Sequence, residues 1–123
     1  VVTIQKLYDL LVTNPTLHPN PIGQRPPTLA SYQNNKNVGI ILSILDGFGI
    51  DSLIIRDISI CNENHTLRKM YGSYLYLIID GGHRCRAVKA FISNKFTIPL
   101  NGKDVLYRDL DQNIKNLFLN SYV

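Results

Sequence analysis

A strand, a tight turn and a helix follow one another near the middle of the chain, and this order constrains the fold more than any other feature. Residues 74–79 form an apolar run rich in aromatic and β-branched side chains, which predicts a buried strand. The run ends at the turn sequence Asp80-Gly81-Gly82. A helical apolar stripe comes next, made of Ala87, Val88, Ala90 and Phe91. We therefore expect a helix that starts directly after the glycines.

The first turn of this predicted helix carries cations where acidic residues are normally preferred. His83, Arg84 and Arg86 fall beside backbone N–H groups that have no intrahelical partner. Two glycines allow a ligand to approach the backbone closely, and N–H groups combined with an arginine fork are typical of a phosphate site. The alternative is a plain tight turn with solvated cations, and the local chemistry alone favours neither interpretation.

Each polar residue of the turn has a candidate role. Arg84 is the first choice for a phosphate anchor, whereas Arg86, two positions further on, is expected to point to a different side. Asp80 is a candidate catalytic or metal-orienting carboxylate, and alternatively it accepts N–H bonds that hold the turn. His83 is a candidate to donate to a phosphate or to relay a proton near neutral pH.

The segment Asp80-Gly81-Gly82-His83-Arg84, followed by Arg86-Ala87-Val88, resembles the Asp-Gly-x-x-Arg-x-x-Ala-Leu signature of the ParB-like nuclease/sulfiredoxin superfamily. The N-terminal domain of GmrSD-type restriction proteins, with its Asp-Gly-Gln-Gln-Arg motif, is the most similar branch. Upstream, Ile22-Gly23-Gln24-Arg25-Pro26 resembles the Gln-Arg-Pro segment of that family, and the apolar helix 38–45 follows in the same order. The chain departs from the family at Gly82-His83, where Gln-Gln is usual, and at 27–29, where an aromatic-Trp pair is common.

The resemblance implies a domain that binds a nucleoside triphosphate (ATP, GTP or CTP) with Mg²⁺, and it leaves hydrolysis open. It implies a DNA-targeting restriction or nuclease-type protein of a phage, mobile element or defence system, with DNA cleavage by a separate HNH-type nuclease domain. We expect residues 1–123 to form one such domain of a longer protein, which could also self-associate. The expected nucleotide-binding residues are Gln24, Arg25, Gly81, Gly82, Arg84 and Arg86. The expected catalytic residues are Asp80 and His83, and no metal site made by the protein alone is expected.

Three other functions fit the same residues. The first is a non-enzymatic, ParB-like module that uses the same turn on DNA phosphates. The second is an interaction domain whose site is degenerate. The third is a sulfiredoxin-like, ATP-dependent redox enzyme, although Gly82 occupies the position of the reactive cysteine in that family. Cys85 follows Arg84 instead, where a helix N-terminus and two arginines could lower the pKa of its thiol.

Composition limits which partners and which cellular compartment we expect for the protein. The chain has 13 Lys and Arg against 9 Asp and Glu, which suits a polyanionic partner without requiring one. No apolar run approaches the ~18 residues of a membrane span, and no signal-type segment precedes the first helix. We therefore expect a cytoplasmic protein whose two cysteines, Cys61 and Cys85, are free thiols.

The remaining elements complete an α+β fold, with helices packed on a small mixed sheet. Helices are predicted over 3–12, capped by Thr3, over 37–46, ended by Gly47, and from Asp109 or Asp111 to about residue 120. A strand is predicted over 52–60, with Leu53, Ile55 and Ile58 buried, and a hairpin over 96–107 around Asn101-Gly102. Polar segments 31–36 and 61–72 are predicted to be loops, and 121–123 to begin a strand.

Overall fold

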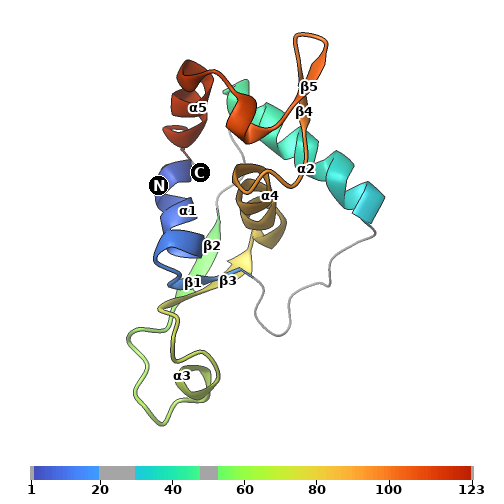
Figure 1. The fold of residues 1–123 in the computed structure, drawn as a ribbon. Helices are drawn as coiled ribbons and strands as arrows, with labels where there is room; N and C mark the ends of the chain where they lie inside the picture. The colour runs from blue at the N-terminus through green and yellow to red at the C-terminus, as the bar shows by residue number, and fades with distance from the viewer. Residues whose placement is uncertain (1, 20–29, 48–52, 123) are drawn as a thin grey trace.

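The computed structural model describes residues 2–19, 30–47 and 53–122, and of residues 30–35 it describes the backbone alone. Its helices are α1 (Ile4–Tyr8), the π-helical turn η1 (Asp9–Thr13), α2 (Ala30–Leu45), α3 (Thr66–Met70), α4 (Gly82–Ile92), the 3₁₀ turn η2 (Tyr107–Asp109) and α5 (Gln112–Leu119). Its strands are β1 (Leu17–His18), β2 (Ile54–Asp57), β3 (Tyr76–Asp80), β4 (Ile98–Leu100) and β5 (Lys103–Val105). The predicted α+β class is confirmed (Figure 1).

A three-stranded mixed sheet lies next to the helices. Its order is β1-β3-β2, with β1 parallel and β2 antiparallel to the central strand β3. Ile78 is fully buried against Leu7, Leu11 and Leu17, so one face of the sheet packs on the α1 end of the chain. Because β1 is only two residues long and ends at Pro19, the sheet is narrow, and β3 carries most of its pairing.

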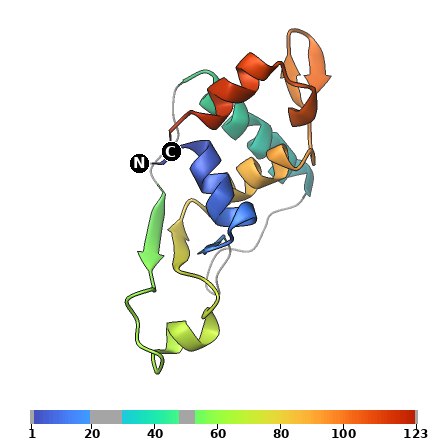
Figure 2. The same cartoon turned by 60° about the vertical axis from the view of Figure 1, so that its left-hand side comes forward.

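Helix α4 occupies the centre of the molecule, between α1 and α5 on one side and α2 on the other (Figures 1 and 2). Its fully buried Phe91 makes edge contacts with Phe118 of α5 and Tyr107 of η2, at ring-centroid distances of 5.5 and 5.6 Å. Ile41 and Ile44 of α2 and Ile4 of α1 complete this core. Helix α4 therefore joins both halves of the chain.

Residues 57–75 form an arm that projects from the sheet and carries α3 at its far end (Figures 1 and 2). Its small apolar cluster consists of Ile58, Tyr71 and Leu77, with Cys61, Leu67 and Tyr74 packed at its edge. The prediction of a plain loop over 61–72 was wrong because His65 caps a short helix. Its Nδ1 accepts a hydrogen bond from the Leu67 amide at 3.1 Å.

Local end signals were read correctly. The Thr3 hydroxyl accepts from the Lys6 amide at the start of α1 at 3.1 Å. Gly47 follows α2 with φ 77°, and the hairpin residues Asn101 and Gly102 have φ values of 52° and 78°, as a type I′ turn requires. Asp111, not Asp109, stands at the N-cap position of α5, but the expected cap is not formed, because its side chain makes no capping hydrogen bond. Near the end of the chain, Tyr122 forms a single antiparallel bridge with Thr3.

Burial was predicted less well than element type. Helix α2 begins at Ala30, so the predicted loop over 31–36 is helical instead. In the 52–60 segment only Ile54–Asp57 is a strand, and Ile55 is 45% exposed while Ile58 is fully buried. In the predicted helix at the end of the chain, the apolar Leu117 is 56% exposed. The exposure of Ile55 and Leu117 shares a cause, since β2 and α5 lie at the edge of the fold and each leaves one face uncovered.

Candidate functional site

The turn between β3 and α4 is built around a glycine that must be glycine. Gly81 adopts φ 103° and ψ 15° immediately before the first residue of α4, a conformation that side chains disfavour. A Cβ atom at this position would also collide with Leu53 and lie 3.0 Å from Nη2 of Arg84. The predicted strand-turn-helix corner is thus confirmed, and its shape depends on both the backbone and the packing of Gly81.

Arg84 and Asp80 form an ion pair across this corner. The Arg84 Nη2 atom lies 3.9 Å from Asp80 Oδ2, one helical turn away in sequence. The Arg84 side chain is only 15% exposed, whereas that of Asp80 is 68% exposed. The carboxylate therefore faces solvent and meets a guanidinium that the fold has largely buried. The residue at the N-cap position of α4 is Gly81, which has no side chain to cap the helix.

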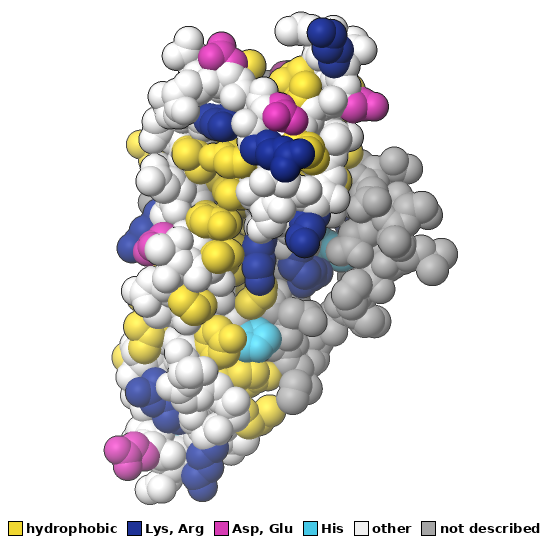
Figure 3. Space-filling model, in the orientation of Figure 1, with side chains coloured by type: hydrophobic (Ala, Val, Ile, Leu, Met, Phe, Trp, Pro, Cys, Tyr) yellow, Lys and Arg dark blue, Asp and Glu magenta, His cyan; other side chains and the backbone are white. Residues whose placement is uncertain are grey.

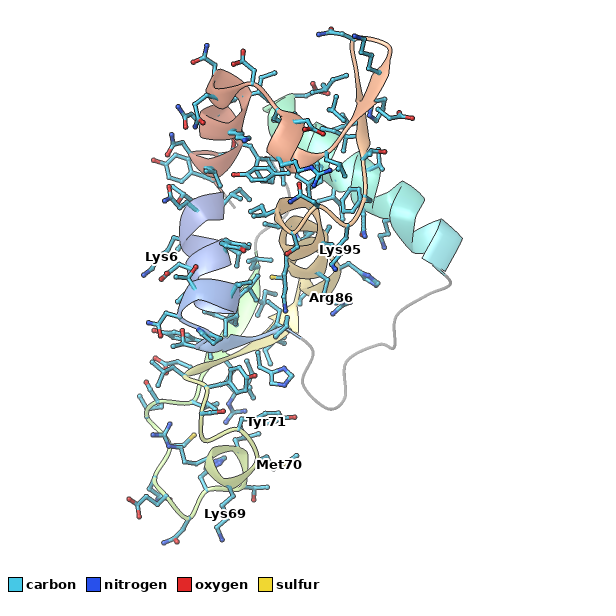
Figure 4. All side chains as sticks on the ribbon, in the orientation of Figure 1. Lys6, Lys69, Met70, Tyr71, Arg86 and Lys95 are labelled. Atoms are coloured by element: carbon cyan, nitrogen blue, oxygen red, sulfur yellow. The ribbon has the colours of Figure 1, made fainter. Side chains whose placement is uncertain are left out.

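Arg86 is the residue whose position the sequence indicated least well. Its guanidinium folds back over the first residue of α4, where a Cβ on Gly82 would lie 2.8 Å from Arg86 Nη1. The same Nη1 donates to the carbonyl of Pro19 at 3.1 Å, which ties the end of β1 to α4 (Figure 4). Arg86 Nε is buried and has no hydrogen-bond partner among the described residues. A side chain at position 82 would therefore require this guanidinium to shift.

Burial also acts on the charge of Arg86. Partial desolvation lowers the pKa of its guanidinium, although an arginine in a protein stays protonated. A positive charge that has lost part of its hydration interacts more strongly with an anion than a fully solvated charge does. The Gly82–Arg86 spacing of four residues on a helix was the signal that could have revealed this contact. The Pro19 carbonyl had no signal in the sequence.

The other predicted site residues are placed as follows. His83 is half-buried in the first turn of α4. Arg84 and Arg86 point to different sides of the helix, as expected, since one pairs with Asp80 and the other with Pro19. Gln24 and Arg25 lie outside the described residues, as do the other motif positions in 22–29. The last described residue before that segment is Pro19, which contacts Arg86.

Cys85 is poorly placed to act as a reactive thiol. It is fully buried against Leu7, Leu17 and Ile78, and burial raises the pKa of its thiol to about 11 despite the two neighbouring arginines. The helix N-terminus and the two arginines could have lowered this pKa, but desolvation of the thiolate outweighs their attraction. Both cysteines are free thiols.

The carboxylates of the described residues form no metal-binding group. Across residues 2–19, 30–47 and 53–122, no three His, Cys, Asp or Glu side chains come together as metal ligands would. At the corner, Asp80 offers one exposed carboxylate. A divalent ion bound here would need most of its ligands from a phosphate group and water.

Comparison with known proteins adds no family to this picture. No family model, curated protein or solved structure matches the chain. In the described part of the chain, no helix has the length and apolar character required to cross a membrane. The chemistry of the β3–α4 corner is therefore the observation on which a function can be argued.

Proposed function

We propose that this domain binds a nucleoside triphosphate at the β3–α4 corner, as part of a DNA-targeting restriction or nuclease-type protein. The observation that carries the proposal is the guanidinium of Arg86, held over Gly82 by the Pro19 carbonyl, with its Nε buried and unpartnered in the described structure. Such a group is already oriented, and an anion beside it would satisfy a donor that has no acceptor among the described residues.

Arg84 supports the same site from the other side of the turn. Its guanidinium is largely buried and is held at the corner by an exposed carboxylate. Phosphate oxygens could replace the Asp80 contact, and they would form stronger bidentate bonds than a contact of 3.9 Å provides. A helix N-terminus also attracts anions through its backbone dipoles, and the corner lies at the start of α4. In this proposal Gln24 and Arg25 contribute further polar contacts.

The proposed Mg²⁺ ion would enter with the triphosphate, because Asp80 is the one carboxylate that the described residues place at the corner and they form no metal-binding group. The ion would supply charge neutralisation on the phosphates. If the domain hydrolyses its nucleotide, Asp80 and His83 are the side chains proposed to orient water or relay a proton. A separate nuclease domain or a second copy of the chain would complete the functional protein.

The test is a thermal-shift panel of ATP, GTP, CTP and UTP with magnesium. One nucleotide should raise the Tm of the wild type, because a ligand that binds only the folded state stabilises it. The shift should disappear in Arg84→Ala and Arg86→Ala and persist in Arg56→Ala, which removes an exposed arginine of β2. Gly82→Ala should also lose it, since the added Cβ displaces the Arg86 guanidinium.

A wild-type protein that no nucleotide stabilises would contradict the proposal. A shift that survives both arginine variants would place the nucleotide elsewhere. If binding is found, phosphate release by Asp80→Asn and His83→Gln, compared with wild type, would decide whether these residues act in hydrolysis.

The second candidate is a non-enzymatic module that binds DNA phosphates. The observation that favours it is the exposed side of α4, where Arg86 and Lys89 lie one turn apart. DNA affinity that falls steeply with salt, without any effect of nucleotide on the Tm, would support this candidate over the first.

A further inference from the structure

Positive charge is concentrated in and around α4. Residues 81–103 contain no aspartate or glutamate, although they include Arg84, Arg86, Lys89, Lys95 and Lys103. Arg86 and Lys89 lie on the outer side of α4, away from the buried Val88 and Phe91. Lys95 is exposed just beyond the C-terminus of α4, and Figure 4 shows it on the same side of the molecule as Arg86.

Two further cations extend this surface across η2 to α5. The Asn94 side chain accepts a hydrogen bond from the Arg108 amide at 2.8 Å, which fixes η2 beside the end of α4. Lys115 in turn donates from Nζ to the Arg108 carbonyl at 3.1 Å and lies 5.5 Å from the centre of the Tyr107 ring. We call these five cations the basic strip: Arg86, Lys89, Lys95, Arg108 and Lys115.

Figure 3 shows lysine and arginine side chains gathered over α4 in the middle of the view, with more above them. Within the described part of the chain, the ion pairs are Lys6–Asp9 and Arg84–Asp80, so no cation of the basic strip is neutralised by a carboxylate. Asp109 and Asp111 follow Arg108 in the chain, at the α5 end of the strip. The positive charge of the strip is therefore offset by nearby aspartates at its α5 end and not at its α4 end.

We propose that the basic strip docks on the phosphate backbone of double-stranded DNA. The strip extends along α4, which at 1.5 Å per residue is roughly 15 Å long, a length that spans several phosphates of a duplex. The choice of DNA as the polyanion rests on the proposed function. The strip itself lies outside the Asp80–Arg84 pair, and it shares only Arg86 with the nucleotide site.

The surroundings of the strip argue against other partners. The large apolar side chains that are exposed in the described structure all lie outside it: Val12, Ile54, Ile55, Ile60, Met70, Leu75, Ile79, Leu117 and Tyr122. A protein interface or a membrane-surface helix uses strongly exposed anchors of this kind, although Figure 3 also shows hydrophobic side chains beside the cations. Single-stranded nucleic acid stacks on exposed aromatic rings, whereas Tyr107 is half-buried with Lys115 over its face.

The experiment measures binding of a short fluorescein-labelled DNA duplex by anisotropy, over a series of salt concentrations and without nucleotide. The test variant is Lys89→Gln/Lys95→Gln. Its matched control is Lys6→Gln/Lys69→Gln, which removes the same charge from exposed lysines on α1 and α3, away from the strip (Figure 4). The strip variant should bind several-fold more weakly, and the slope of log K against log salt should fall by about 2. The affinity and the salt slope of the control variant should both stay closer to those of the wild type.

Three results would overturn the proposal: no binding of duplex by the wild type, equal losses in the two double variants, or equal or tighter binding of single-stranded oligonucleotides or phosphatidylserine vesicles. Nucleotide-dependent Tm shifts measured on the strip variant keep this test separate from that of the proposed function. An unchanged shift with weakened DNA binding would show that the two sites are distinct. If no nucleotide binds while the strip variant still loses DNA affinity, the nucleotide proposal fails and the strip proposal stands.

Discussion

The core around α4 and the arm that carries α3 are held together very differently. The α4 core joins α1, α2, β4 and α5 around Phe91 and Phe118, both fully buried. The arm has two buried apolar residues, Ile58 and Tyr71, which pack on Leu77 of β3, and it leaves Ile60 85% and Met70 48% exposed. Because stability follows buried apolar contact, the arm should open locally while the core unfolds only with the whole domain. The candidate site therefore stands on the most stable part of the molecule.

The largest effect is expected from Phe91→Ala. This substitution removes a ring that contacts Phe96, Tyr107 and Phe118, and it should lower the free energy of unfolding by about 3–5 kcal/mol. Urea denaturation measures it. Tyr71→Ala is the matched change in the arm, and it should cost clearly less and shift only the arm's hydrogen exchange. Equal costs for the two variants would contradict the comparison.

Cys85 should make the stability of the core depend on alkaline pH. The pKa of its thiol rises from 9.0 to about 11 on folding, so the folded state retains the proton over this range while the unfolded state loses it. The contribution, at most about 3 kcal/mol, is fully present below pH 9 and is lost as the pH rises toward 11. As the pH rises from 9 to 11, the difference between the urea midpoints of the wild type and of Cys85→Ala should become smaller.

Gly81→Ala tests the corner itself. The positive φ costs about 1–2 kcal/mol for any side chain, and the collision with Leu53 adds a packing cost of similar size. Gly102→Ala is the control, because its φ is 78° and a Cβ there meets nothing within 4 Å. Both variants carry the strain of a positive φ, and only Gly81→Ala also meets Leu53. The difference between their losses in unfolding free energy therefore gives the packing cost at Gly81. A Gly81→Ala protein as stable as Gly102→Ala would show that Leu53 moves aside freely.

The smallest effect is expected at His18, where the arm meets the sheet. Its ring makes edge contacts with Tyr71 and Tyr74 at 5.3 and 4.7 Å, and burial lowers the pKa of the imidazole below 6.5. The folded state thus favours the neutral ring. This contribution is present above pH 6.5 and is lost as the pH falls below it. The Tyr71 ring signals in NMR spectra should shift below that pH in wild type and not in His18→Phe, while Phe91 signals stay constant.

Sequence reasoning succeeded where the signal is local. The Thr3 cap, the turn residues Asn101-Gly102, and the order of strand, glycine turn and helix around Gly81 were all read correctly. Each depends on the backbone preferences of a few consecutive residues. The candidate site was located for the same reason, since Asp80 and Arg84 are one helical turn apart.

The tertiary structure decided everything that depends on which neighbour covers a residue. Periodicity marked Ile55 and Leu117 as apolar, but only packing shows that both remain exposed. The same holds for charge. Cys85 lies between two arginines in sequence, yet the core against Ile78 and Leu17 sets its pKa. Arg86 is held by the carbonyl of Pro19, 67 residues away, and desolvation and long-range contacts of this kind exist only once the chain has folded.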